Sequence, residues 1–162
     1  METYKDFTSI ETNELIAIRN GFFNPVFTIT DGNFMYGKVI LNKTSKALPV
    51  LETLGESWTL KRQSIFGDRT LHILNAVGEP VGTVTNGDTY LKMADGFDAY
   101  LAGPWFDTQH NKLVAWKQSS YSYRKPFKIT VDRSLVKTMK EMPLLVLLGT
   151  YLIFLEYTRS LA

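Results

Sequence analysis

Apolar and polar residues alternate along most of the first 130 residues, which is the pattern of β-strands with one buried face. Turn residues such as Asp31-Gly32, Asn86-Gly87 and Asp95-Gly96 interrupt the alternation, and these residue types tolerate the positive φ of tight turns. The spacing predicts about ten to twelve short strands. The clearest strands are expected at Asn13–Arg19, Pro25–Thr30, Phe34–Leu41, Ser57–Gln63, Leu71–Leu74, Val81–Thr85, Asp88–Met93, Phe97–Leu101, Leu113–Gln118 and Phe127–Val131.

Two of the predicted hairpins resemble each other in sequence. FTITDGNFMYGKV (Phe27–Val39) and LHILNAVGEPVGTV (Leu71–Val84) both place two alternating apolar residues before Asp or Asn. A turn with glycine follows in each, then Gly-x-Val, and the second turn is one residue longer. We therefore expect a sheet built partly from related hairpins, with a bulge or bend at Gly37.

Near the end of the chain, Met142–Leu155 (MPLLVLLGTYLIFL) contains no charged residue. At about 1.5 Å per residue, such a helix spans roughly 21 Å, which is shorter than the roughly 30 Å core of a bilayer. Its apolar residues point in every direction, so the helix belongs inside a large core or inside a membrane. We favour a core helix enclosed by a curled sheet, and a membrane tail anchor is the alternative.

These patterns predict a mainly β protein, with one domain over residues 1–162. We expect a closed antiparallel barrel of about 10–12 strands around a buried hydrophobic C-terminal helix at about 143–158. The core residues of this helix are expected to be Leu144, Leu145, Leu148, Leu152 and Phe154. Gly149-Thr150 would weaken the helix by about 1 kcal/mol, unless a strand side chain packs closely there.

The hairpin pattern x-I-x-D/N-x-x-G-x-x-x-G-x-V, followed by further strands and an apolar helix, resembles the tubby C-terminal-like superfamily. The smaller members of that superfamily include the LURP-one-related proteins and the phospholipid scramblases. The resemblance implies a closed barrel of about twelve strands around a hydrophobic C-terminal helix, here Pro143–Tyr157. In the tubby branch, basic side chains on the barrel surface bind phosphoinositide headgroups.

Composition removes several classes of chemistry. The chain contains no cysteine, which excludes disulfides, thiolate catalysis and zinc–thiolate sites. His72 lies in an alternating strand and His110 in a loop, and neither has the neighbours of a metal site or a catalytic triad. We therefore expect no enzyme activity, no metal and no cofactor. The polar N-terminus does not match a secretory signal, so a cytoplasmic location is expected.

The net charge of +2 is unevenly distributed. Residues 110–140 contain eight Lys and Arg against Asp132 alone, a local charge of +7. Within 119–140, tyrosines alternate with basic residues, a combination that favours an anionic membrane interface. On charge and aromatic character, the candidate lipid contacts are Arg124, Lys125, Lys128, Tyr121 and Tyr123.

The leading hypothesis is a non-catalytic binding module that docks peripherally on anionic lipid or phosphoinositide headgroups. Two alternatives are a protein–protein adaptor and a scramblase-like membrane protein anchored by the C-terminal helix. A basic surface that is only solvated is a further interpretation. Nucleic acid is disfavoured as a partner because no RNA-binding motif accompanies the basic and aromatic residues.

Overall fold

Twelve antiparallel strands close into a barrel in the computed structural model, which describes residues 3–21, 24–41, 48–65, 68–119 and 124–160. Each strand pairs with the next one along the chain, and β1 (Glu14–Asn20) pairs with β12 (Phe127–Val131) to close the sheet. The other strands are β2 (Val26–Thr30), β3 (Met35–Ile40), β4 (Val50–Thr53), β5 (Glu56–Ile65), β6 (Asp68–Leu74), β7 (Pro80–Thr85), β8 (Tyr90–Met93), β9 (Asp98–Leu101), β10 (Trp105–Phe106) and β11 (Lys112–Gln118). The predicted fold class is confirmed.

The sequence analysis did not predict four short elements: β4, β10, the 3-10 helix η1 (Phe7–Ser9) and the helix α1 (Arg133–Thr138). The strand expected over Asp88–Met93 is shorter in the structure. Asn86, Gly87 and Asp88 all have positive φ, at 53°, 68° and 65°, so this stretch is a turn and β8 begins only at Tyr90.

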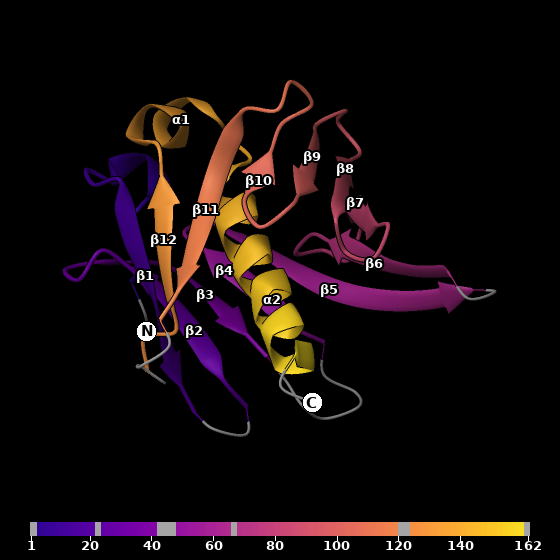
Figure 1. Cartoon of the computed structure of the whole chain (residues 1–162), viewed down its shortest axis with the longest axis horizontal. Helices are drawn as coiled ribbons and strands as arrows, with labels where there is room; N and C mark the ends of the chain where they lie inside the picture. The colour runs from indigo at the N-terminus through magenta and orange to yellow at the C-terminus, as the bar shows by residue number, and fades with distance from the viewer. Residues whose placement is uncertain (1–2, 22–23, 42–47, 66–67, 120–123, 161–162) are drawn as a thin grey trace.

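The barrel has two different ends because neighbouring strands run in opposite directions. Connections after even-numbered strands lie at one end, together with α1, and we call this the cap end. Connections after odd-numbered strands lie at the other end, where the helix α2 (Met142–Ser160) finishes, and we call this the exit end. Figure 1 shows α2 running through the barrel between these two ends.

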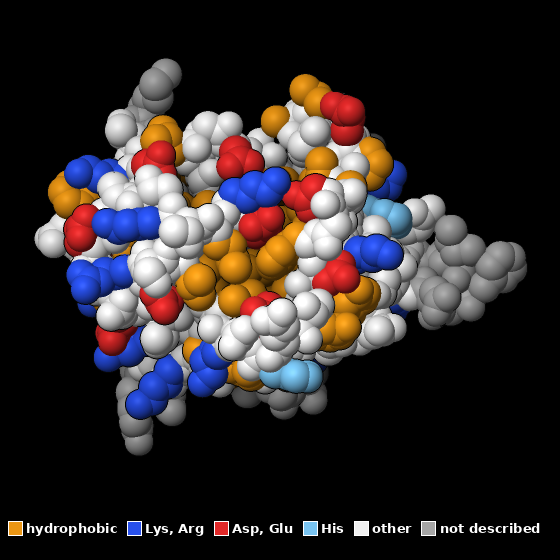
Figure 2. Space-filling view, turned by 90° about the horizontal axis from the view of Figure 1, so that it is seen from above, with side chains coloured by type: hydrophobic (Ala, Val, Ile, Leu, Met, Phe, Trp, Pro, Cys, Tyr) orange, Lys and Arg blue, Asp and Glu red, His pale blue; other side chains and the backbone are white. Residues whose placement is uncertain are grey.

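The cap end is closed in part by α1 and by the short 3-10 helix η1 (Phe7–Ser9), which contact each other. Asp6 is the N-cap of η1 and Asp132 is the N-cap of α1. Their carboxylates accept hydrogen bonds from the backbone N–H groups of Thr8 and Ser134, respectively, both at 2.8 Å. The buried residues that the two elements bring to the core are Phe7, Ile10 and Val136. Figure 2 looks down on this end and shows hydrophobic side chains exposed at its centre, surrounded by charged and polar groups.

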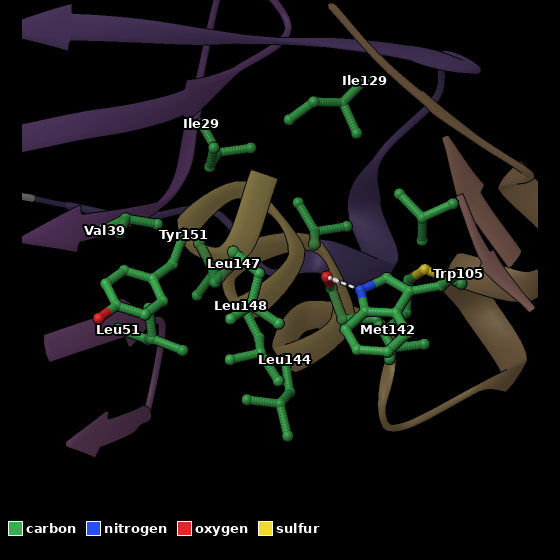
Figure 3. Close-up of a cluster of buried hydrophobic side chains, with 14 of the residues drawn as sticks. Ile29, Val39, Leu51, Trp105, Ile129, Met142, Leu144, Leu147, Leu148 and Tyr151 are labelled. Atoms are coloured by element: carbon green, nitrogen blue, oxygen red, sulfur yellow. Dashed lines mark hydrogen bonds between the residues drawn. The ribbon is translucent and has the colours of Figure 1, made fainter. Parts of the chain in front are cut away.

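The helix α2 forms the centre of the core, and strand residues such as Ile29, Val39 and Leu51 surround it (Figure 3). Buried side chains occur all round the helix because strands enclose it on every side. The five predicted core residues are all at most 8% exposed: Leu144, Leu145, Leu148, Leu152 and Phe154. The prediction of a buried hydrophobic helix is therefore confirmed.

Gly149 gives α2 a notch into which two indole rings fit. A Cβ at this position would lie 2.1 Å from Cη2 of Trp116 and 2.7 Å from Nε1 of Trp105. Both indoles also donate hydrogen bonds to the helix, Trp105 to the Leu145 carbonyl at 2.9 Å and Trp116 to the Thr150 hydroxyl at 3.1 Å. Close packing by these two strand side chains thus offsets the low helix propensity of glycine, which is the condition that the sequence analysis set for a stable helix here.

The two related hairpins have the same register. Ile29 pairs with Gly37 in β2–β3, and Ile73 pairs with Gly82 in β6–β7. The pairing then shifts by one residue, so that Tyr36 and Val81 are the extra, bulged residues.

A third hairpin, β10–β11, follows the same plan, although its sequence gives little sign of it. Its register shifts between Trp105 and Phe106, which makes Leu113 the bulged residue. An Asx turn opens all three loops: the side-chain oxygen of Asp31, Asn75 or Asp107 accepts two backbone N–H groups. The barrel therefore repeats this hairpin every four strands, always with its turn at the cap end.

Candidate functional site

The candidate lipid-binding residues follow β11 at the exit end. Arg124 and Lys125 are exposed in the connection to β12, and Lys128 is exposed on the outer face of β12. Lys128 lies directly opposite Lys117 of β11, which is also exposed. We call these four residues the cationic edge. Tyr121 and Tyr123, the two aromatic candidates, lie outside the described residues.

Two lysines that face each other on neighbouring strands repel, at a cost of a few tenths of a kcal/mol to about 1 kcal/mol. Within the cationic edge, Nζ of Lys128 lies 3.5 Å from Oε1 of Glu14. Both side chains of that pair are more than half exposed, so water screens it and it contributes little to stability. The four side chains of the cationic edge therefore bring four positive charges together on exposed surface, and Glu14 is a weakly coupled counter-charge to one of them.

The rest of the basic segment lies elsewhere. Arg133 donates to the Glu11 carbonyl at 2.9 Å, and Nζ of Lys137 lies 3.3 Å from the Glu11 carboxylate. Lys140 pairs with Asp95 at 3.1 Å. These three residues and Lys112, which begins β11, are at the cap end, so the structure divides the +7 segment between the two ends of the barrel.

Sequence reasoning missed Arg19, which β1 brings beside the cationic edge. The Arg19 backbone N–H donates to the Arg124 carbonyl at 2.6 Å, and its guanidinium lies 5.1 Å from the centroid of the Phe154 ring. The sequence does contain an indication of this position. Arg19 lies two residues after Ala17 and four after Leu15 in β1, so it belongs to the same face of the strand, which points into the barrel. An arginine on the inward face near a strand end marks a charge at the rim of the core.

A second group of charges surrounds the end of α2. Arg62 donates two hydrogen bonds to the Asp88 carboxylate, at 2.9 and 3.0 Å, and Arg159 lies 3.8 Å from it. The hydrogen bonds that Arg62 donates to Asp88 raise the pKa of Arg62, and burial raises the pKa of Tyr151 beside it. Because Asp88 accepts both of these hydrogen bonds, the cluster holds the turn after β7 against β5.

Among the described residues, no group of three or more His, Asp and Glu side chains is placed to hold a metal ion. His72 is half-buried in β6, and His110 is exposed in the β10–β11 turn. The φ of His110 is 64°, and its N–H donates to the Asp107 carbonyl as that of Gly78 does to Asn75. His110 therefore occupies a turn position that suits glycine, and its placement has a structural explanation.

The comparisons with known proteins identify no relative. The chain matches no family model, no curated protein and no solved structure. One described stretch, Met142–Arg159, is long and apolar enough to cross a membrane by length and composition, and 61% of it is buried. The core helix of a soluble protein passes the same test, so this stretch alone is weak support for a membrane anchor.

Proposed function

We propose that this protein is a non-catalytic module that docks peripherally on anionic lipid through the cationic edge. The observation that carries the proposal is the direct opposition of Lys117 and Lys128, next to the exposed Arg124 and Lys125. Two lysines directly opposite each other repel, and an anionic surface bound there would relieve that repulsion. Each Lys or Arg close to an anionic membrane contributes about 1 kcal/mol. The resemblance of the hairpin pattern to the tubby C-terminal-like superfamily, in whose tubby branch basic surface residues bind phosphoinositides, agrees with such a role.

The docking surface proposed here is smaller than the whole basic segment. Arg133, Lys137 and Lys140 face the opposite end and contact Glu11 or Asp95, so one flat membrane would not meet both groups. The anionic lipids of the cytoplasmic leaflet are the expected partner.

Co-sedimentation with phosphatidylcholine vesicles containing increasing fractions of phosphatidylserine tests this proposal, at low and high salt. The test variant is Arg124→Gln/Lys125→Gln/Lys128→Gln. Glutamine is preferred to glutamate because a carboxylate at position 128 would repel Glu14. Binding by the wild type should rise with anionic lipid and fall with salt, and the variant should lose about 3 kcal/mol of binding energy.

The matched control is Lys61→Gln/Lys92→Gln/Lys112→Gln, which removes the same charge from exposed strand positions outside the cationic edge. If this control loses as much binding as the test variant, the attraction is a net-charge effect and the proposed surface is wrong. Absence of wild-type binding at every lipid composition would reject lipid docking altogether.

The anchored alternative makes a different prediction for cell fractionation. A protein held by the cationic edge leaves the membrane in high salt, because salt screens exposed charges. A protein held by α2 stays until detergent is added, and for this its buried core side chains would have to leave the barrel. Release by detergent only would replace peripheral docking with the anchored function.

A further inference from the structure

The cap end contains an apolar hollow of about 360 Å³ that no described segment covers. Trp58, Val81, Met93 and Leu144 line it with hydrophobic surface. A smaller hollow of about 220 Å³ continues from it along the β6–β7 turn and shares Glu56, Trp58 and Asn75 with it. Mouths of barrels are common sites for ligands and partners.

The repeat of the hairpin explains why this hollow is apolar. The bulged residues Tyr36, Val81 and Leu113 occupy equivalent places, and a bulge redirects its side chain relative to the regular alternation. Tyr36 is 1% exposed and Leu113 is 3% exposed, whereas Val81 is only half-buried. The second hairpin therefore lacks a cover that its two equivalents have.

On the first hairpin, the cover is the N-terminal segment of the chain itself. The Phe7 ring packs edge-on against Tyr36, with the ring centroids 5.9 Å apart. Two residues earlier, the Lys5 backbone N–H donates to the Met35 carbonyl at 2.8 Å, and its ammonium lies 3.9 Å from the centroid of the Phe34 ring. A short segment with an aromatic residue and a lysine thus provides the cover.

Acidic side chains at the second hairpin would suit a covering segment that, like the N-terminal one, contains an aromatic residue and a lysine. Glu56, Asp95, Glu141 and Lys140 line the hollow, a net charge of −2. Lys140 pairs with Asp95 at 3.1 Å, and among the described residues neither Glu56 nor Glu141 forms an ion pair. The residue equivalent to Phe34, defined by its hydrogen bond to the Asx residue, is Glu79, so the second hairpin has a carboxylate where the first has the ring that Lys5 contacts.

We propose that the hollow binds a short peptide segment of a partner protein, with an aromatic side chain on Val81 and Met93 and a Lys or Arg beside it. The cation would meet Glu56 or Glu141, which line the hollow. Met93 suits such a contact because its flexible thioether adapts to an incoming ring. Two exposed apolar residues next to the hollow, Leu54 at 52% and Val77 at 76%, extend the surface along which a peptide can lie. This proposal is independent of lipid docking, which uses the exit end.

Two acetylated and amidated pentapeptides test the proposal: Lys-Ser-Phe-Ser-Lys and its counterpart with glutamate in place of both lysines. Each is titrated into the full chain, and methyl resonances are followed by two-dimensional ¹H–¹³C spectra. We expect saturable shifts at the methyl groups of Val81, Met93 and Leu144 with the lysine peptide. The glutamate peptide should bind more weakly by on the order of tenfold, because like charges repel.

Glu56→Gln/Glu141→Gln should remove most of the preference for the lysine peptide. Both side chains lie outside the buried core, so the variant keeps the fold. Glu14→Gln/Glu156→Gln is the matched control, since it removes two carboxylates that do not line the hollow. Equal binding of the two peptides, shifts at other methyl groups, or no saturable shift would each overturn the proposal. So would broadening of the same methyl groups with protein concentration alone, which would assign the hollow to a second copy of this chain.

Discussion

The β2–β3 and β6–β7 hairpins share one register, one bulge and one Asx turn, yet their surroundings differ. Phe7 covers the bulged Tyr36 of the first hairpin, whereas the bulged Val81 of the second is open to solvent. The same local structure therefore serves two purposes at the cap end. Where the chain supplies its own cover, the hairpin adds to the core, and where it does not, the hairpin presents an apolar surface.

The largest effect is expected from Leu148→Asp, because α2 supports both hairpins from inside. Leu148 is fully buried, and an unpaired aspartate there should cost more than about 4 kcal/mol. Soluble yield and the near-ultraviolet circular dichroism signal should both be lost. Thr158→Asp, on the exposed side of the same helix, is the control. A folded and stable Leu148→Asp protein would contradict the central position of α2.

Phe7→Ala would convert the covered hairpin into an open one. The cost should be about 3–5 kcal/mol, since a buried aromatic side chain is lost and a cavity remains over Tyr36. Val77→Ala at the open hairpin should change the free energy of unfolding by less than about 0.5 kcal/mol, because Val77 is 76% exposed. Urea denaturation compares the two variants. Similar values for both would mean that the N-terminal cover adds no stability.

Tyr36 makes the covered hairpin sensitive to alkaline pH. Burial and a hydrogen bond to Asp31 raise the pKa of Tyr36 to about 12, whereas an unfolded chain has a tyrosine pKa of about 10. The neutral form is favoured in the fold, so this stability is complete below pH 10 and is lost as the pH rises toward 12. The loss should amount to about 2–3 kcal/mol.

Tyr36→Phe should lack this part of the pH dependence. Its free energy of unfolding, measured in urea between neutral pH and pH 12, should therefore fall less steeply than that of the wild type. Tyr100→Phe, at an exposed tyrosine, is the control and should follow the wild-type curve. Parallel curves for wild type and Tyr36→Phe would mean that Tyr36 ionises equally easily in both states.

The smallest effect concerns the third hairpin. His110 has a φ of 64°, in the left-handed region that costs a residue with a Cβ about 1 kcal/mol, and the equivalent residue of the second hairpin is Gly78. His110→Gly should therefore raise the melting temperature slightly, whereas Gly78→His should lower it. The opposite result for either exchange would argue against the equivalence of the two turns.

Sequence patterns predicted the barrel because its physical causes are local. Alternation marks the inward face of each strand, and the all-round apolar run of α2 requires walls on all sides. Even the notch at Gly149 could be anticipated, since glycine in a buried helix needs close packing. These features depend on residue types at fixed spacings, which a sequence displays.

The candidate sites depend on how the strands are paired, so they were harder to predict from the sequence than the barrel was. The sequence gives Lys117 and Lys128, but only the pairing of β11 with β12 makes them opposite neighbours. Likewise, Val81 belongs to an alternating strand in the sequence, and a one-residue shift against Leu74 redirects it into the hollow. The six residues of α1 are too few and too polar to show helical periodicity, so the division of the basic segment between two ends was hidden as well.

The pairing of β1 with β12 has a consequence for how the protein is made. Synthesis on the ribosome produces β1 early, but its partner strand and then the core helix emerge only after every other strand has been translated. Until then the inward faces of the strands have nothing to pack on, so hydrophobic surface stays exposed during translation. Contacts this distant in sequence slow folding. We therefore expect the nascent chain to rely on chaperones and to reach its native state only after α2 has left the ribosome.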